Sequence, residues 1–223
     1  MVTEFWDMLI RYMPIFYTAT LITIKISSLS IVIGFLLGLF SALGKMSNNF
    51  MVRWPCNFYV WFFRATPLLV QIFMIYFGLP QFGINLSPFV AGVIAMSING
   101  GAYYAEIVRS GIQSVHYGQL EAARSLGMSF PLSMRRIILP QAIKVIIPPF
   151  GNESIILIKD TSLLSTITIM EITLTAQRLI SSTWKPFELY LIAAIYYAII
   201  TTVLNYALYK YEIKVSFSQR RLA

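Results

Sequence analysis

The sequence has few charged residues, one cysteine and one histidine. Asp, Glu, Lys and Arg together make up 12% of its 223 residues, which is about half of their share in soluble domains. Because Cys56 is the only cysteine, neither a disulfide within the chain nor a cysteine zinc cluster can form. His116 is the only histidine, so a zinc motif that needs two histidines is excluded. No metal or organic cofactor is therefore expected.

Motifs for nucleotide hydrolysis and for a serine nucleophile are also absent. Gly38–Met46 resembles a phosphate loop, but five residues separate its glycines instead of four, and Met46 follows the lysine where Ser or Thr is needed. No Gly-x-Ser-x-Gly element is present. The pair of acids Glu153 and Asp160 could in principle serve an intramembrane protease, but nothing else in the sequence supports that role. The sequence therefore indicates a protein without catalysis of its own, and ATP hydrolysis would belong to another polypeptide.

Hydrophobic residues, in contrast, are abundant. They account for 57% of the chain, against about 45–50% in globular domains. A soluble fold cannot cover its surface with so few charges, so most of this surface must face lipid. The net charge is +8, but the basic residues lie between long apolar runs and do not form the basic face of a nucleic-acid-binding domain. The composition predicts a membrane protein that contacts lipid and no nucleic acid.

Five apolar segments are long enough to cross about 30 Å of hydrocarbon as helices. Turn residues between Gly78 and Pro88 divide one long uncharged stretch into two passes. Thr161–Met170 is too short to cross and is expected at the outer face or as a re-entrant segment. We therefore predict an all-α membrane protein with a single domain, residues 1–223. The expected passes lie at about residues 18–43, 58–77, 88–108, 141–158 and 187–209, with a cytoplasmic loop at 109–140.

The distribution of lysine and arginine predicts the orientation of the passes. An odd number of passes places the termini on opposite sides, and basic loops resist translocation. Nine basic residues lie on one side and four on the other. The two sets of segments are 44–54, 109–140 and 211–223, and 1–14, 79–87 and 159–185, respectively. The first set is expected to be cytoplasmic, with the N-terminus outside and the C-terminus inside.

Small residues recur every four positions in the first pass, at Ser30, Gly34, Gly38 and Ala42. Such a ridge lets another helix backbone approach closely. The partner helix would belong to the same chain or, in the second interpretation, to another subunit.

The cytoplasmic loop contains a short helix with a small face. Glu121 is expected in its first turn, where the helix dipole favours an acid, and Ala122 and Ala123 give it a low profile. Gly127 can adopt the left-handed conformation that ends a helix. This helix is suited to dock into a cytoplasmic partner, and forces on it would reach both flanking passes. The alternative is a helix that lies in the membrane interface.

The spacing in this loop resembles the EAA loop of the membrane subunits of ABC importers. Glu121-Ala122-Ala123 is followed by Gly127, Ile137 and Leu139-Pro140 at the positions of that pattern. The rest of the chain is similar to permeases for polar amino acids. The matching segments are Arg64–Gln71, in which Ala65 stands where glycine is commoner, and Gly78–Gly83, Leu139–Ala142 and Lys159–Leu163.

This resemblance implies the five-helix fold of type I ABC importer permeases in a multi-pass protein of the bacterial inner membrane. It implies two copies of a separate ATPase subunit, a second permease subunit (a copy or a sister chain) and an extracytoplasmic amino-acid-binding protein. Glu121, Ala122, Ala123 and Gly127 would couple the chain to the ATPase. The solute would be a polar amino acid: cystine, glutamine or a basic amino acid. The alternative is an ATP-independent channel or a membrane scaffold, neither of which would need a docking helix.

Polar residues within the passes are candidates for the solute path, because each is costly in hydrocarbon. Glu153 lies in the fourth pass and Asp160 at its outer end, nearly two helical turns apart. Pro148 and Pro149 cannot donate hydrogen bonds, which predicts a broken helix of the kind that lines cavities. The candidate path residues are Asn152 and Glu153, as acceptors for an ammonium group, together with Asp160 and Asn99.

Structural roles remain open for the two acids. Asp160 could cap the segment that starts at Thr161, with Lys159 close enough to neutralise it. Glu153 could pair with a basic group of another helix.

Partners or positions are also expected for the remaining charged groups and for the histidine. Glu106, seven residues after Asn99, is expected to pair with Arg109. Lys25 and Arg64 could line the path and meet the carboxylate of a solute, or Arg64 could reach toward the interface. His116 is expected to be solvated.

Overall fold

The computed structural model describes residues 2–220, and the side chains of residues 4–213, as helices joined by turns. No strand occurs within residues 2–220. Arg221, one of the basic residues assigned to the cytoplasmic side, lies outside the described residues. The α-helices are α1 (Val2–Lys45), α2 (Phe50–Ala65), α3 (Leu68–Phe73), α4 (Pro88–Gln113), α5 (Tyr117–Ser125), α6 (Phe130–Ser133), α7 (Leu139–Asp160), α8 (Ile172–Thr183) and α9 (Pro186–Arg220). Shorter elements are the π-helices η1 (Met74–Gly78) and η3 (Met134–Ile138) and the 3-10 helices η2 (Leu79–Phe82) and η4 (Thr161–Ile167).

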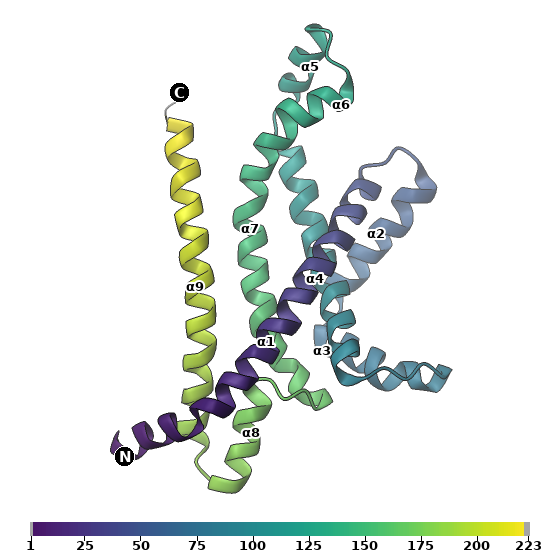
Figure 1. The fold of residues 1–223 in the computed structure, drawn as a ribbon. Coiled ribbons are helices and arrows are strands. Elements are labelled where there is room, and N and C mark those ends of the chain that lie inside the picture. The colour runs from purple at the N-terminus through teal and green to yellow at the C-terminus, as the bar shows by residue number, and fades with distance from the viewer. Residues whose placement is uncertain (1, 221–223) are drawn as a thin grey trace.

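The long helices form an open bundle in which α1 crosses α4 and α7 obliquely (Figure 1). The two ends of the described chain lie at opposite ends of this bundle, and α5 and α6 lie at the same end as the C-terminal end of α9. α8 and the N-terminal part of α1 lie at the other end. There Phe16 stacks on Tyr196 of α9 with 5.2 Å between ring centroids, and the buried Glu171 caps α8 by accepting from Thr173 N and Leu174 N.

The small-residue ridge of α1 packs against α4 of the same chain. A Cβ atom on Gly34 would lie 3.0 Å from the carbonyl oxygen of Ser97, and one on Gly38 would lie 2.7 Å from the Cβ of Tyr104. The two backbones are therefore as close as glycine allows. Within this chain, the interpretation of the ridge as internal packing is confirmed.

The range expected as one second pass, 58–77, is not a straight helix. α2 ends at Ala65, and the following segment, Leu68–Phe82, turns away by 108°. Pro67 causes the break, because the residue before a proline avoids the helical conformation, and Thr66 has an extended backbone with φ −111° and ψ 144°. The result is a sharp corner in the chain at Thr66.

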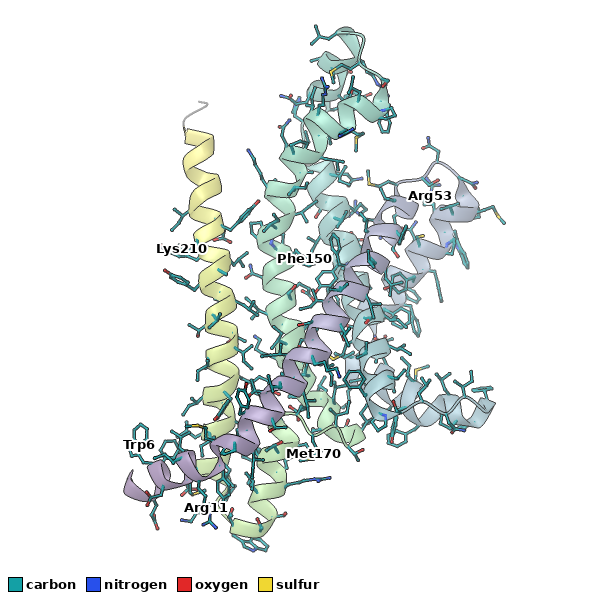
Figure 2. The ribbon with its side chains drawn as sticks, viewed as in Figure 1. Trp6, Arg11, Arg53, Phe150, Met170 and Lys210 are labelled. Atoms are coloured by element: carbon teal, nitrogen blue, oxygen red, sulfur yellow. The ribbon has the colours of Figure 1, made fainter. Side chains whose placement is uncertain are left out.

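The predicted break in the fourth pass is wrong, because α7 runs without interruption from Leu139 to Asp160. Pro148 and Pro149 both lie inside α7, since the fixed φ of proline suits a helix, and each costs hydrogen bonds but not the helix itself. Packing on both sides holds the adjacent turn: the ring of Phe150 lies 5.2 Å from that of Phe35 on α1 and 4.7 Å from that of Tyr104 on α4. Figure 2 shows Phe150 in the middle of the bundle.

Two helices of the described chain are long and apolar enough to cross a membrane by themselves, over Glu4–Lys45 and Pro186–Ile213. The bent pair of α2 and the Leu68–Phe82 segment would make a third. α1 has 44 residues and is therefore about 66 Å long, more than twice the thickness of hydrocarbon. The count of five passes stays a prediction.

Candidate functional site

A cavity of about 440 Å³ lies at the corner between α2 and α3 and is bounded by α4 and α7. We call it the α4–α7 cavity. Three of the four residues expected on the solute path line it: Asn99, Glu153 and Asp160. The full lining consists of Arg64, Ala65, Thr66, Pro67, Leu68, Asn99, Tyr103, Glu153, Ile156 and Asp160.

Hydrogen bonds hold the corner at Thr66 in place. Gln71, which is buried, donates to the carbonyl oxygens of Phe63 and Thr66 at 3.0 and 3.1 Å and to the Thr66 hydroxyl at 2.8 Å. Asn99 donates from α4 to the same Phe63 carbonyl and to Gln71 Oε1, both at 3.1 Å. These donors satisfy carbonyls that the break in the helix would otherwise leave unpaired. The amide nitrogen of Asn99 is thus used to attach the corner to α4.

The two acids of α7 line the cavity, and neither forms a direct ion pair within the described part of the chain. Asp160 makes no side-chain capping bond at Thr161, so the capping alternative is wrong. Glu153 forms no ion pair with any described residue, so the alternative in which it pairs with a basic group of another helix is also wrong. Arg64 lines the cavity as well, and its guanidinium lies over the Tyr103 ring, 5.3 Å from the centroid. One cavity therefore contains two carboxyl groups and one cation.

Two other candidates lie outside the cavity. Asn152 is exposed and does not line it. Lys25, also exposed, extends over the Phe89 ring with Nζ 5.2 Å from the centroid. Within the described residues, neither Asn152 nor Lys25 lies where its side chain could contact the same solute molecule as Glu153.

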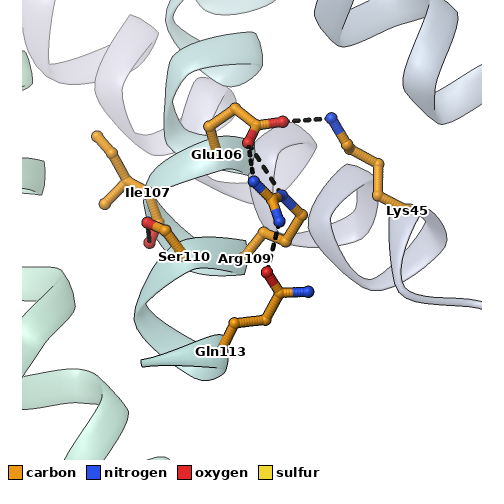
Figure 3. Close-up of polar contacts among 6 residues, drawn as sticks. All are labelled: Lys45, Glu106, Ile107, Arg109, Ser110 and Gln113. Carbon is orange, nitrogen blue, oxygen red and sulfur yellow. Dashed lines mark hydrogen bonds and ion pairs between the residues drawn. The ribbon is translucent and has the colours of Figure 1, made fainter. Parts of the chain in front are cut away.

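A second group of charges lies nearer the other end of α4 (Figure 3). Glu106 accepts from Arg109 Nη2 at 2.7 Å and from Arg109 Nε at 2.9 Å, which confirms the expected pair. Lys45, from the last turn of α1, binds the other oxygen of the same carboxylate. Arg109 also donates to Gln113. The carboxylate therefore links the end of α1 to α4.

The loop between α4 and α7 forms the exposed tip of the bundle, with α5 as its main helix (Figure 1). His116 is exposed and caps α5 by accepting from Gly118 N at 3.1 Å. Because the helix starts at Tyr117, Glu121 lies in its second turn, and the expectation of a first-turn acid is wrong. Glu121 and Ala122 are exposed, whereas Ala123 is buried against the chain.

Gly127 ends α5 as predicted, with φ +78°. Met128 N donates to Ala123 O at 3.1 Å and Gly127 N to Arg124 O at 2.9 Å, the two bonds of a Schellman motif. A Cβ atom on Gly127 would meet no heavy atom within 4 Å. The glycine is therefore needed for its backbone conformation and not for space.

Sequence reasoning missed Tyr103, Thr66 and Gln71 as parts of the site. Tyr103 lies four residues after Asn99 and three before Glu106, so all three share one face of α4. That spacing could have identified Tyr103. Thr66 and Gln71 depend on the corner at Pro67, which apolar periodicity does not indicate.

Comparisons with known proteins agree with this architecture. The family model described as "Binding-protein-dependent transport system inner membrane component" matches residues 34–215. The nopaline transport system permease protein NocM of Agrobacterium fabrum is 41% identical over 209 residues, covering 89% of this chain and 87% of the relative. The L-cystine transport system permease protein TcyB of Bacillus subtilis is 44% identical over 175 residues, covering 78% and 75%. A crystal structure of an amino acid ABC transporter with histidines has a TM-score of 0.89 at 44% identity, covering 94% of this chain and 98% of that chain.

Proposed function

Because this chain belongs to the family of binding-protein-dependent transport system inner membrane components, we propose that the α4–α7 cavity is the place where its solute passes. The chain is the permease subunit of an ABC importer for an amino acid, and it is an inner membrane component. It is a transport subunit and not an enzyme, and ATP hydrolysis in such systems belongs to a separate ATPase.

The charges of the cavity fit an amino acid. Glu153 and Asp160 can accept hydrogen bonds from ammonium groups, and Arg64 can pair with a carboxylate as a planar two-point donor. A volume of about 440 Å³ lies in the range of small-molecule sites and is sufficient for one amino acid. Two acids against one cation favour a basic amino acid among the three expected classes, with cystine and glutamine as the others.

The membrane arrangement remains part of the proposal. Five passes with the N-terminus outside and the C-terminus in the cytoplasm are supported by the nine-to-four distribution of basic residues. The positions of the chain ends at opposite ends of the bundle agree with an odd number of passes (Figure 1). In this orientation α5 lies in the cytoplasm, where the exposed Glu121 and Ala122 can contact an ATPase subunit.

The complete importer would contain two permease subunits, two ATPase subunits and an extracytoplasmic amino-acid-binding protein. A single chain leaves the polar α4–α7 cavity open on one side, and polar groups in hydrocarbon are costly. A second permease subunit, as a copy or a sister chain, would cover that side.

The Glu153→Gln substitution tests the cavity. We expect uptake of a basic amino acid by the reconstituted importer to fall at least tenfold, because an amide has no negative charge to pair with the ammonium group of the solute. Arginine, glutamine and cystine are measured in parallel with the cognate binding protein. Glu212→Gln, an exposed acid on α9, is the matched control and should transport normally. Normal uptake of every solute by a correctly assembled Glu153→Gln complex would show that the solute does not pass through the α4–α7 cavity.

A further inference from the structure

One face of α4 is polar from the α4–α7 cavity to the end of the helix. Successive residues of an α-helix are rotated by about 100°, so positions spaced by four, three, four and three lie on one face. The residues at these positions are all polar: Asn99, Tyr103, Glu106, Ser110 and Gln113. We call them the polar stripe.

The other faces of α4 are occupied by neighbouring helices. α1 meets it at Ser97 and Gly101, and α7 meets it at Gly100 and Gly111, where Leu157 and Ile146 approach the glycines. All four contact positions lie outside the polar stripe. Exposure increases along the stripe, from the buried Asn99 through the half-buried Glu106 to the exposed Gln113. The chain covers the first part of the stripe with polar and charged groups: Asn99 binds the corner at Thr66, and Arg64 lies over Tyr103. Lys45 binds Glu106, whereas Ser110 and Gln113 are exposed. A helix face that carries only polar groups and polar neighbours in a membrane protein is expected to border water or a polar partner.

The Lys45–Glu106–Arg109 ion pairs lie directly on this stripe (Figure 3). Tyr103, the last residue of α4 that lines the cavity, lies three residues before Glu106, about 4.5 Å along the helix axis. Its side chain is only 19% exposed, and those of Lys45 and Arg109 are 13% and 32% exposed. The group therefore stands between the cavity and the end of α4 that leads into α5.

We propose that the polar stripe is the inner half of the solute path and that the Lys45–Glu106–Arg109 group is its gate. This inference rests on the function proposed above, since it takes the cavity as the outer half of the path. Each oxygen of Glu106 binds a different cation, one from α1 and one from α4. An amino acid can exchange these partners, because its ammonium group can bind Glu106 while its carboxylate binds Lys45 or Arg109. The side chains of these ion pairs can then separate without leaving an unpaired charge in the membrane.

Thiol labelling of the assembled importer tests the gate. In a Cys56→Ala background, Tyr103→Cys places one thiol on the cavity side of the ion pairs. A membrane-impermeant sulfonated maleimide is added to inside-out vesicles, without nucleotide or with ATP and vanadate. We expect at least tenfold slower labelling in one of the two states. Adding Glu106→Gln should remove most of that protection, because Lys45 and Arg109 then repel each other, whereas Glu106→Asp should retain it.

Three further cysteines control the experiment. Ser110→Cys, on the far side of the ion pairs, should react in both states, and the fully buried Ala102→Cys in neither. Ala65→Cys, which also lines the cavity, replaces Tyr103→Cys if the latter does not assemble. A purely structural ion pair would change the amount of assembled complex but not its state-dependent labelling.

Labelling from the outer side, in spheroplasts, separates the two proposals. If Tyr103→Cys reacts from outside but never from the cytoplasmic side, or if its cytoplasmic rate does not depend on Glu106, the gate is overturned and the cavity stands. If it reacts from neither side in any state, the cavity and the gate both fail. State-dependent protection that Glu106→Gln abolishes supports the gate.

Discussion

Replacing Gly38 by valine is expected to prevent the permease from accumulating as a folded protein. A Cβ atom at this position would lie 2.7 Å from Tyr104 Cβ, 2.9 Å from the carbonyl oxygen of Gly101 and 3.0 Å from Ala105 N. Two of these atoms belong to the backbone of α4 and cannot rotate away, so the helices themselves must separate. Overpacking of this kind costs about 3 kcal/mol or more, a large part of the stability of a typical domain.

The measurement is the yield of monodisperse protein in mild detergent, followed by its thermal unfolding. Gly78→Val is the matched control, because a Cβ atom there would meet nothing within 4 Å and the backbone has a negative φ. A Gly38→Val protein with normal yield and unfolding temperature would contradict the described α1–α4 contact.

Gly127→Val is expected to uncouple ATP hydrolysis from uptake in an otherwise assembled importer. The residue has φ +78°, and a left-handed conformation costs a β-branched residue about 1–2 kcal/mol. The end of α5 would relax toward another conformation and lose its Schellman bonds. Since α5 is the proposed contact with the ATPase, we expect the number of amino acids imported per ATP to fall at least tenfold.

Gly127→Asn separates the backbone effect from other causes. Asparagine tolerates the left-handed conformation, and the site has space for a side chain, so this variant should transport almost normally. Uptake and ATPase rates are measured on the same proteoliposomes after co-purification shows equal assembly. Equal coupling in the valine and asparagine variants would argue against α5 as the docking element.

Local chemistry predicted several details of this structure. A ridge of small residues indicates a close helix contact, a Gly after a short helix indicates a left-handed cap, and an acid three residues before an arginine indicates a pair. Gly38, Gly127 and Glu106 each behave in this way. These features depend on one helix or on the shape of one side chain, so sequence spacing is sufficient to identify them.

Features that depend on packing between distant segments were not predictable in the same way. Two adjacent prolines indicate a break, but contacts of Phe150 with α1 and α4 keep α7 intact. The single Pro67 breaks its helix, and hydrogen bonds from Gln71 and Asn99 stabilise the break by satisfying the freed carbonyls. Proline thus has opposite effects at the two places, and part of the difference lies in distant neighbours: Asn99 at the corner, and Phe35 and Tyr104 beside Phe150.

The close approach of α1 to α4 restricts how such an importer can move. Two backbones in contact through Gly34 and Gly38 cannot slide past each other without collision, so the backbones of α1 and α4 must move together, and only side chains such as those of the gate can rearrange between them. This pair of helices forms the fixed frame of the subunit. A change in the width of the cavity must then come from α7, because hydrogen bonds from Asn99 attach the corner at Pro67 to α4. The exposed tip is joined to both walls, since α4 leads into α5 and η3 leads into α7, so a pull at the tip acts between a fixed wall and a moving one.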